Sequence, residues 1–303
     1  MRVSKLIAAT VLAALSSTSM AQTLRPDQAG FRDLYKELVE TNTTQSSGSC
    51  TLAAERMAER FKAAGFADSD ITLFATPEKP KDGGLVAILR GTSKKAKPIL
   101  LLAHIDVVEA RREDWVRDPF KLIEEDGYFY GRGTFDDKAQ ASIWADLLIR
   151  MKAGKGPKRT IKLALTCGEE SPAVFNGAEW LVKEHKDWID AEFALNEGGI
   201  GVSDDKGNPL KLAFQAGEKV YQDFRLEARN PGGHSSQPRP DNAIYQLTAG
   251  LNRLAATEFP VQFTDASRAY FTAMASQMGG EVGAAMLAML ANPADAAANA
   301  IVS

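Results

Sequence analysis

The stretch Pro98-Ile-Leu-Leu-Leu-Ala-His-Ile-Asp-Val-Val-Glu-Ala110 decides the fold. Its uninterrupted apolar run, residues 99–103, is typical of a strand buried on both faces of a parallel sheet. The run ends in His104 and Asp106, which point to the same side of an extended chain because they are two residues apart. In α/β sheets, ligands bind in the crevice beyond the carboxyl ends of the strands. The pair is therefore a candidate for metal ligation or acid–base chemistry, with a structural histidine beside a loop carboxylate as the alternative.

Helical and strand-like patterns alternate on either side of this stretch. Apolar residues at helical spacing predict helices over residues 27–40, 51–64, 137–151 and 176–185. Short apolar runs predict strands over residues 71–75, 85–89, 99–103, 128–130, 161–165 and 193–195, with a turn-rich segment at 77–84. This order predicts an α/β fold with a mixed, mainly parallel sheet sandwiched by helices.

The beginning of the chain has the pattern of a secretory signal peptide. Arg2 and Lys5 give a positive start, residues 6–15 are apolar, and Ser19-Met20-Ala21 is a small-residue cleavage pattern. We therefore expect residues 1–21 to be removed and the mature protein to be periplasmic or secreted. Nothing later in the sequence resembles a membrane span.

The texture of the sequence changes near Gly217 and predicts two domains, a catalytic domain over residues 22–216 and a smaller α+β domain over residues 217–303. In the second domain we expect a strand at 220–228, a helix at 242–255 and a helical tail at 272–303. The net charge of −3 gives no indication of nucleic-acid binding, which favours basic faces. Cys50 and Cys167 could form a disulfide in an oxidising compartment or remain buried thiols.

Acidic and imidazole groups follow four predicted strands or turns. They are His104 with Asp106, Asp136 with Asp137, Glu169 with Glu170, and Glu197. Carboxylates crowded into one crevice raise each other's pKa unless a cation compensates their charge. The pattern therefore favours a divalent metal site, with two ions bridged by one carboxylate. Mixed imidazole and carboxylate ligands suit Zn²⁺ better than Ca²⁺ or Mg²⁺.

The adjacent residues Glu169 and Glu170 suit two different roles. One can bind metal while the other takes a proton from the bound water and passes it to the leaving group. Two solvated loop glutamates are the alternative for this dipeptide alone.

Five motifs together resemble one known family, the M20 family of metallopeptidases. In chain order they are Ala-His-Ile-Asp (103–106), Gly-Arg-Gly-Thr-Phe-Asp-Asp-Lys (131–138), Cys-Gly-Glu-Glu-Ser (167–171), Asn-Glu-Gly-Gly (196–199) and Gly-Gly-His-Ser (232–235). The family includes carboxypeptidases, dipeptidases and aminoacylases with two zinc ions per subunit. The fourth motif is most similar to the carboxypeptidase S-like branch, and the resemblance implies a zinc exopeptidase-like fold with a lid or dimerisation domain.

The resemblance implies a set of zinc ligands. His104 and Glu197 would bind the first ion, Glu170 would bind the second, and Asp136 would bridge the two. The family completes the second site with a histidine near the C-terminus.

The resemblance also implies roles for four residues that do not bind metal. Asp106 would orient His104, Glu169 would be the general base and acid, and Asp137 would be structural. His234, in the lid domain, would stabilise the developing oxyanion, across a homodimer interface in dimeric members of the family.

The sequence departs from the family at its C-terminal side. It has three histidines, and besides His104 and His234 there is His185, which lies in a charged helix end and is expected to face solvent. We therefore expect the sequence to be an N-terminal portion of the family pattern that ends inside the lid. A chain of that extent is expected to bind the second metal weakly, to turn over slowly and to aggregate; the alternative is that the native gene product continues.

Two functional hypotheses follow. The first is a secreted zinc hydrolase that cleaves amide bonds of peptides or N-acyl amino acids. The second is a non-catalytic, truncated remnant that binds one metal or dimerises without turnover. A serine hydrolase is disfavoured because the sequence has no Gly-x-Ser-x-Gly motif.

Overall fold

The computed structural model describes residues 24–171, 175–218 and 220–303. These residues form two compact units, of which the first ends at Glu197 and the second is Gly198–Ser303. The predicted signal peptide, residues 1–21, lies outside the described residues. The predicted domain boundary near Gly217 falls within the second unit and stays a prediction. Among the described residues, no helix combines the length and apolar character needed to cross a membrane.

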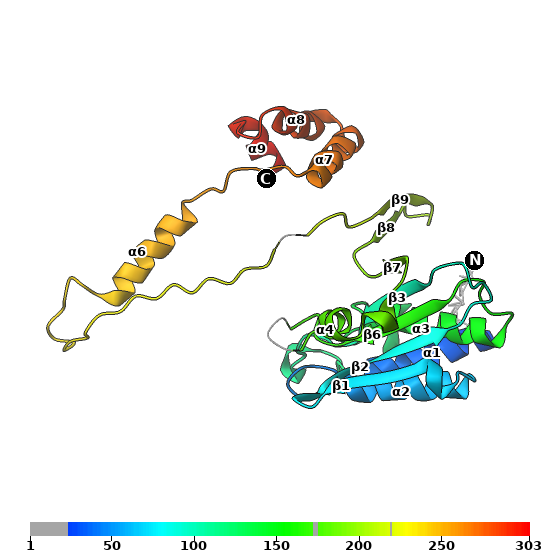
Figure 1. The fold of residues 1–303 in the computed structure, drawn as a ribbon. Helices are drawn as coiled ribbons and strands as arrows, with labels where there is room; N and C mark the ends of the chain where they lie inside the picture. The colour runs from blue at the N-terminus through cyan, green and yellow to red at the C-terminus, as the bar shows by residue number, and fades with distance from the viewer. Residues whose placement is uncertain (1–23, 172–174, 219) are drawn as a thin grey trace, which may run out of the picture. The chain divides into compact units, whose positions relative to one another are not determined.

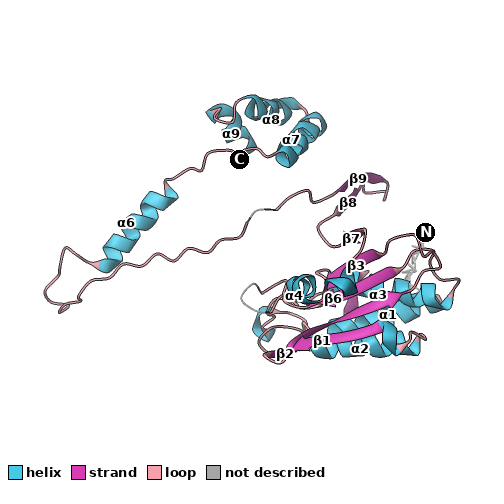
Figure 2. Cartoon of the chain, viewed as in Figure 1, coloured by secondary structure: helices cyan, strands magenta, loops and turns pink. Residues whose placement is uncertain are grey.

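The first unit is built on a five-stranded mixed sheet (Figures 1 and 2). Its strands lie in the order β1 (Ile71–Thr76), β2 (Lys79–Leu89), β6 (Ile161–Thr166), β3 (Ile99–His104) and β7 (Phe193–Leu195). β2 pairs antiparallel with both of its neighbours, while β3 pairs parallel with β6 and β7. Four of the five strands therefore run in one direction, which confirms the predicted α/β fold with a mainly parallel sheet.

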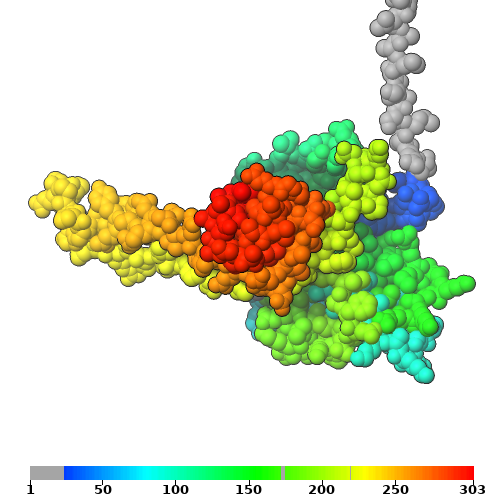
Figure 3. All heavy atoms as spheres, turned by 90° about the horizontal axis from the view of Figure 1, so that it is seen from above, coloured from blue at the N-terminus to red at the C-terminus, as the bar shows by residue number. Residues whose placement is uncertain are grey.

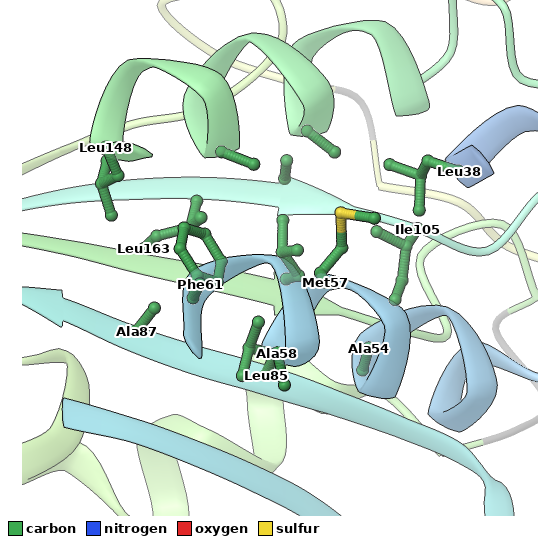
Figure 4. Close-up of a cluster of buried hydrophobic side chains, with 14 of the residues drawn as sticks. Leu38, Ala54, Met57, Ala58, Phe61, Leu85, Ala87, Ile105, Leu148 and Leu163 are labelled. Atoms are coloured by element: carbon green, nitrogen blue, oxygen red, sulfur yellow. The ribbon is translucent and has the colours of Figure 1, made fainter. Parts of the chain in front are cut away.

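Helices cover both faces of this sheet. On one face lie α1 (Pro26–Glu40), α2 (Cys50–Ala63) and α3 (Lys138–Ala153), whose apolar side chains meet those of the strands in one core cluster. Figure 4 shows Met57 and Phe61 of α2 reaching into this cluster, with Leu148 of α3 above them. On the other face lie α4 (Gly177–Glu184) and the short α5 (Lys186–Ile189).

Alternate residues of the strands supply the two cores, as the two-residue period of a strand requires. On β2, Leu85 and Ala87 face α2, whereas Val86, between them, packs in the smaller cluster with Leu181 of α4. All six residues of β6 are buried. β3 lies between β6 and β7, and four of its six residues are buried. The predicted apolar run at 99–103 is thus confirmed as an interior strand.

The β1–β2 hairpin corrects the prediction of a turn over residues 77–84. β2 begins at Lys79, because Thr76 pairs with Lys79 and leaves a two-residue connection. Gly83 and Gly84 suggest a turn in the sequence, yet here they allow close approach: a Cβ at Gly83 would lie 2.3 Å from the carbonyl oxygen of Phe74. Tertiary pairing therefore overrides the local turn signal.

The sequence pattern does not predict two short elements of the first unit. They are β4 (Ile123–Glu125), which pairs with β5 (Tyr128–Tyr130), and α5, which follows α4.

The interpretation that His185 faces solvent is wrong. Its half-buried ring stacks on Trp188, with 3.8 Å between the ring centroids, and its centroid lies 4.7 Å from that of Trp180. The ring reaches these tryptophans because α5 follows directly after the end of α4.

The second unit contains a hairpin, β8 (Ile200–Ser203) with β9 (Pro209–Ala213), then α6 (Ala243–Ala255) and three helices, α7 (Asp265–Met278), α8 (Gly280–Ala291) and α9 (Ala296–Val302). The helix at 242–255 and the helical tail are confirmed, and Figure 3 shows the tail, orange to red, as one packed cluster. The strand predicted at 220–228 is wrong. The structure places these residues in no strand, and no described strand pairs with them.

We predict that Tyr35→Phe will destabilise the first unit. Tyr35 is 4% exposed, and its hydroxyl donates a 2.6 Å hydrogen bond to the carbonyl oxygen of Thr134. Losing this bond is expected to lower the free energy of unfolding by about 1–2 kcal/mol at pH 7, measured by urea denaturation. Tyr128→Phe, at a 69% exposed side chain, is the control and should change little.

The same pair of variants has a pH signature. Burial raises the pKa of Tyr35 to about 12. A raised pKa means that the stabilisation is complete below pH 10 and is lost as the pH rises towards 12. The stability of Tyr35→Phe should therefore fall less steeply than that of the wild type between pH 10 and 12. Equal slopes would contradict this assignment.

Candidate metal centre

Three parallel strands deliver the candidate residues to one edge of the sheet. β3 ends at His104, which is paired with Thr166, the last residue of β6. Glu169 and Glu170 follow β6 after two residues, and Glu197 follows β7 after one. Because the carboxyl ends of parallel strands lie at the same edge, these side chains converge there.

His104 is the centre of the cluster and is 3% exposed. Its Nε2 atom lies 2.9 Å from Asp136 Oδ1, 3.6 Å from Glu197 Oε2 and 3.9 Å from Glu169 Oε2. Its Nδ1 atom points the other way, 3.1 Å from the backbone oxygen of Asp106 and 3.5 Å from the Asp106 carboxylate. The ring therefore presents Nε2 to the carboxylates while Asp106 holds its opposite side.

Two overlapping groups of side chains have the spacing of a metal site. One consists of His104, Asp136 and Glu170, and the other of His104, Asp137 and Glu197. In each group one ligand atom from every residue lies within 4.8 Å of the others. The structure thus brings the four predicted ligands together, while their roles stay predictions.

Asp137 is the residue that sequence reasoning assigned differently, as structural only. It is the N-cap of α3, but its carboxylate makes no capping hydrogen bond, and it is 4% exposed. Its Oδ2 atom has no hydrogen-bond partner within the described chain. Its place beside Asp136 was visible in the sequence, but which of two adjacent carboxylates faces inward depends on the backbone.

The charges at the site perturb one another. Burial opposes the charged form of His104, but the hydrogen bond and charge of Asp106, followed by the charges of Glu197 and Asp137, raise the pKa of His104 to about 10. Burial raises the pKa of Asp137 to about 7, partly offset by His104 and reinforced by Glu197. Burial also raises the pKa values of Glu169 and Glu170.

This environment fits a divalent cation. Several carboxylates surround one imidazole, and the buried Asp137 Oδ2 lacks a hydrogen-bond partner in the described structure. A cation would compensate the repulsion between these carboxylates. The mixed set of nitrogen and oxygen ligands suits a transition metal, although it does not identify zinc.

The loop after β6 depends on a glycine. Gly168 has φ +90°, and a Cβ there would lie 1.8 Å from the carbonyl oxygen of Phe175. Beyond it, the backbone N–H of Glu170 donates a 3.0 Å hydrogen bond to Asp106 Oδ2. Asp106 therefore contacts both His104 and the segment that carries the two glutamates.

Two other predicted features lie outside the carboxylate cluster. His234 is exposed in the second unit, with its Nδ1 atom 2.8 Å from Ser236 Oγ, and its role in a lid or dimer stays a prediction. Cys50 and Cys167, left open by the sequence, form a disulfide.

The comparisons with known proteins agree on one family. The family described as Peptidase family M20/M25/M40 matches residues 100–296, more than half of the chain, which confirms the resemblance drawn from the motifs. The chain is 32% identical over 197 residues to the human N-fatty-acyl-amino acid synthase/hydrolase PM20D1, covering 63% of this chain and 39% of that protein. It is 32% identical over 193 residues to carboxypeptidase S of Saccharomyces cerevisiae, covering 60% and 32%. The chain thus spans well under half the length of these relatives.

Among solved structures, the chain is similar to an M20 family metallo-carboxypeptidase, Sso-CP2, from Sulfolobus solfataricus. The two are 21% identical with a TM-score of 0.49, and the match covers 61% of this chain and 39% of that one.

We predict that Asp106→Asn will weaken metal binding about 10- to 100-fold, as changes to groups behind a metal ligand do. The amide can still accept the hydrogen bond from Glu170 but loses the charge that supports His104. Competition with a chromogenic chelator measures the affinity. Asp126→Asn, at an exposed residue of the β4–β5 turn, is the control. Equal affinities for both variants would show that Asp106 does not support the site.

Proposed function

The chain belongs to peptidase family M20/M25/M40, and from this premise we propose that it is the catalytic part of a metal-dependent hydrolase of amide bonds. The observation that carries the proposal is the buried His104, whose Nε2 atom faces Asp136, Glu197 and Glu169 within 3.9 Å. A structural histidine would need one partner, not a ring of carboxylates.

We assign the metal ligands as the sequence predicts them. His104 and Glu197 would hold one ion, Glu170 a second, and Asp136 would bridge them; zinc is the proposed metal. Asp137, which shares a group with His104 and Glu197, is an additional candidate. The bound metal would supply a water of lowered pKa and polarise the substrate carbonyl.

Glu169 is the proposed general base and acid. Its side chain is 53% exposed, so it can reach a water molecule and a substrate, and its Oε2 lies 3.9 Å from His104 Nε2. Burial raises its pKa, which brings the carboxylate closer to the range in which it can both accept and return a proton at neutral pH. It would take a proton from water and deliver it to the leaving nitrogen, while Asp106 keeps the His104 ring in place.

The proposed substrates are peptides or N-acyl amino acids. Two relatives support this range, since one is named a hydrolase of N-fatty-acyl-amino acids and another a carboxypeptidase. His234 is proposed to act from a lid domain on the developing oxyanion, in a homodimer through that domain.

The proposed location is periplasmic or secreted. The disulfide between Cys50 and Cys167 supports it, because disulfides persist in oxidising compartments. The positively charged and apolar start of the sequence supports it independently.

We predict that Glu169→Gln will lower kcat for a dipeptide or N-acyl amino acid by at least about 100-fold, because the proton acceptor is lost. Bound metal, counted by atomic emission, should be unchanged. Glu78→Gln, at an exposed position of the β1–β2 turn, is the control and should keep full activity. Undiminished hydrolysis by Glu169→Gln would remove the assigned base, and a wild-type protein with at most one metal and no turnover would favour a non-catalytic remnant.

A further inference from the structure

We propose that the Cys50–Cys167 disulfide is a positioning element of the metal centre. It holds the loop that carries Glu169 and Glu170, so metal binding depends on the redox state of the two cysteines. The inference rests on the proposed function, because it concerns the same site.

The disulfide joins two distant segments directly behind the site. Cys50 is the first residue of α2, and Cys167 immediately follows β6, 117 positions later in the chain. Both side chains are buried, at 2% and 6% exposure. Since Cys167 is separated from Glu169 by Gly168 alone, the disulfide fixes the start of the loop that carries the two glutamates to the N-terminus of α2.

In the part of this loop that the structure describes, single hydrogen bonds add to the disulfide. The N–H of Gly177 donates to the carbonyl oxygen of Cys167 at 2.7 Å, and the Asn176 side chain donates to that of Gly168 at 3.3 Å. Glu170 N–H donates to Asp106 at 3.0 Å. Gly168 itself gives the chain more freedom than any other residue. Once the disulfide is open, these exchangeable hydrogen bonds are the described restraints on the two glutamates.

The disulfide also lies close to the group that supports His104. The two Sγ atoms and one carboxylate oxygen of Asp106 all lie within 4.8 Å of one another. Asp106 in turn accepts from Glu170 and lies 3.5 Å from His104 Nδ1. A displacement of the sulfur atoms would therefore move the Asp106 carboxylate, and with it the candidate ligands His104 and Glu170.

The surroundings leave little room for such a displacement. The cavity beside the disulfide has a volume of about 10 Å³ and is lined by Thr43, Asp106 and Gly168 among others. That is space for about one water molecule. Two separate thiols need more room than a bonded pair, because nonbonded heavy atoms keep about 3.5–4.0 Å apart. Opening the bond is therefore expected to shift the loop or Asp106.

The test compares three states of the full chain with zinc as the probe. They are the oxidised wild type, the wild type reduced with a phosphine, and the double variant Cys50→Ala/Cys167→Ala. In the reduction the phosphine takes an oxygen atom from water to become a phosphine oxide, and the S–S bond becomes two thiols. The variant is needed because thiols can bind zinc themselves.

Two readouts decide the outcome. In the metal-free protein, amide exchange at residues 168–170 should be faster in the reduced wild type and in the variant than in the oxidised wild type. Zinc affinity, from chelator competition, should fall at least about 10-fold in both, in the range typical for lost support of a ligand. The phosphine should not change the variant, and reoxidation should restore the wild type. If the variant does not fold, amide exchange in the metal-free reduced and reoxidised wild type carries the test, because that readout does not involve zinc.

Leu148→Ala separates positioning from general stability. Leu148 is fully buried in the same core, on α3, so its truncation destabilises the unit without touching the loop (Figure 4). Zinc affinity within two-fold in all redox states, or an equal loss in Leu148→Ala, would overturn the inference. If zinc affinity follows the redox state but the protein shows no hydrolysis, the result supports the role of the disulfide and contradicts the proposed function.

Discussion

The parallel pairing of β3 with β6 and β7 is the constraint on which the site depends. It places His104 beside Thr166 and brings the chain after β7 to the same edge. Side chains alternate along a strand, so a slip of one residue in this register would turn His104 to the other face of the sheet. The buried apolar residues of β3 and β6 oppose such a slip, because it would exchange the side chains that pack in the two cores. The core of the first unit therefore determines the geometry of the site.

This convergence has an electrostatic cost. Four segments bring carboxylates towards one imidazole, and burial together with mutual repulsion raises the pKa values of Asp137, Glu169 and Glu170. A structure selected only for stability would have little reason to keep such a group of like charges. Strongly perturbed groups gathered at the carboxyl end of a parallel sheet are typical of functional sites. The cost is itself an argument that the cluster binds something positive.

Much of the first unit could be predicted from the sequence. The strands at 128–130 and 193–195 have the predicted ends, because apolar runs bounded by turn residues mark them clearly. The failures share a cause. Residues 79–84 form part of a strand through pairing with β1, and residues 220–228 have the alternation of a strand but pair with no described strand. A local pattern gives the preference of a segment, whereas a strand exists only with its partner.

The same limit explains which parts of the site the sequence could reveal. The motifs identified the residues that converge, since each follows a recognisable strand. They could not show that the carboxylate of Asp137 turns inward, which depends on how α3 begins, nor that Cys50 meets Cys167, since α2 and β6 are far apart in the chain. The disulfide lies behind the residues that would touch a metal, whereas Asp137 lies among them. Sequence motifs thus record the chemistry of a site, while the contacts that hold its residues in place arise from segments that only the folded chain brings together.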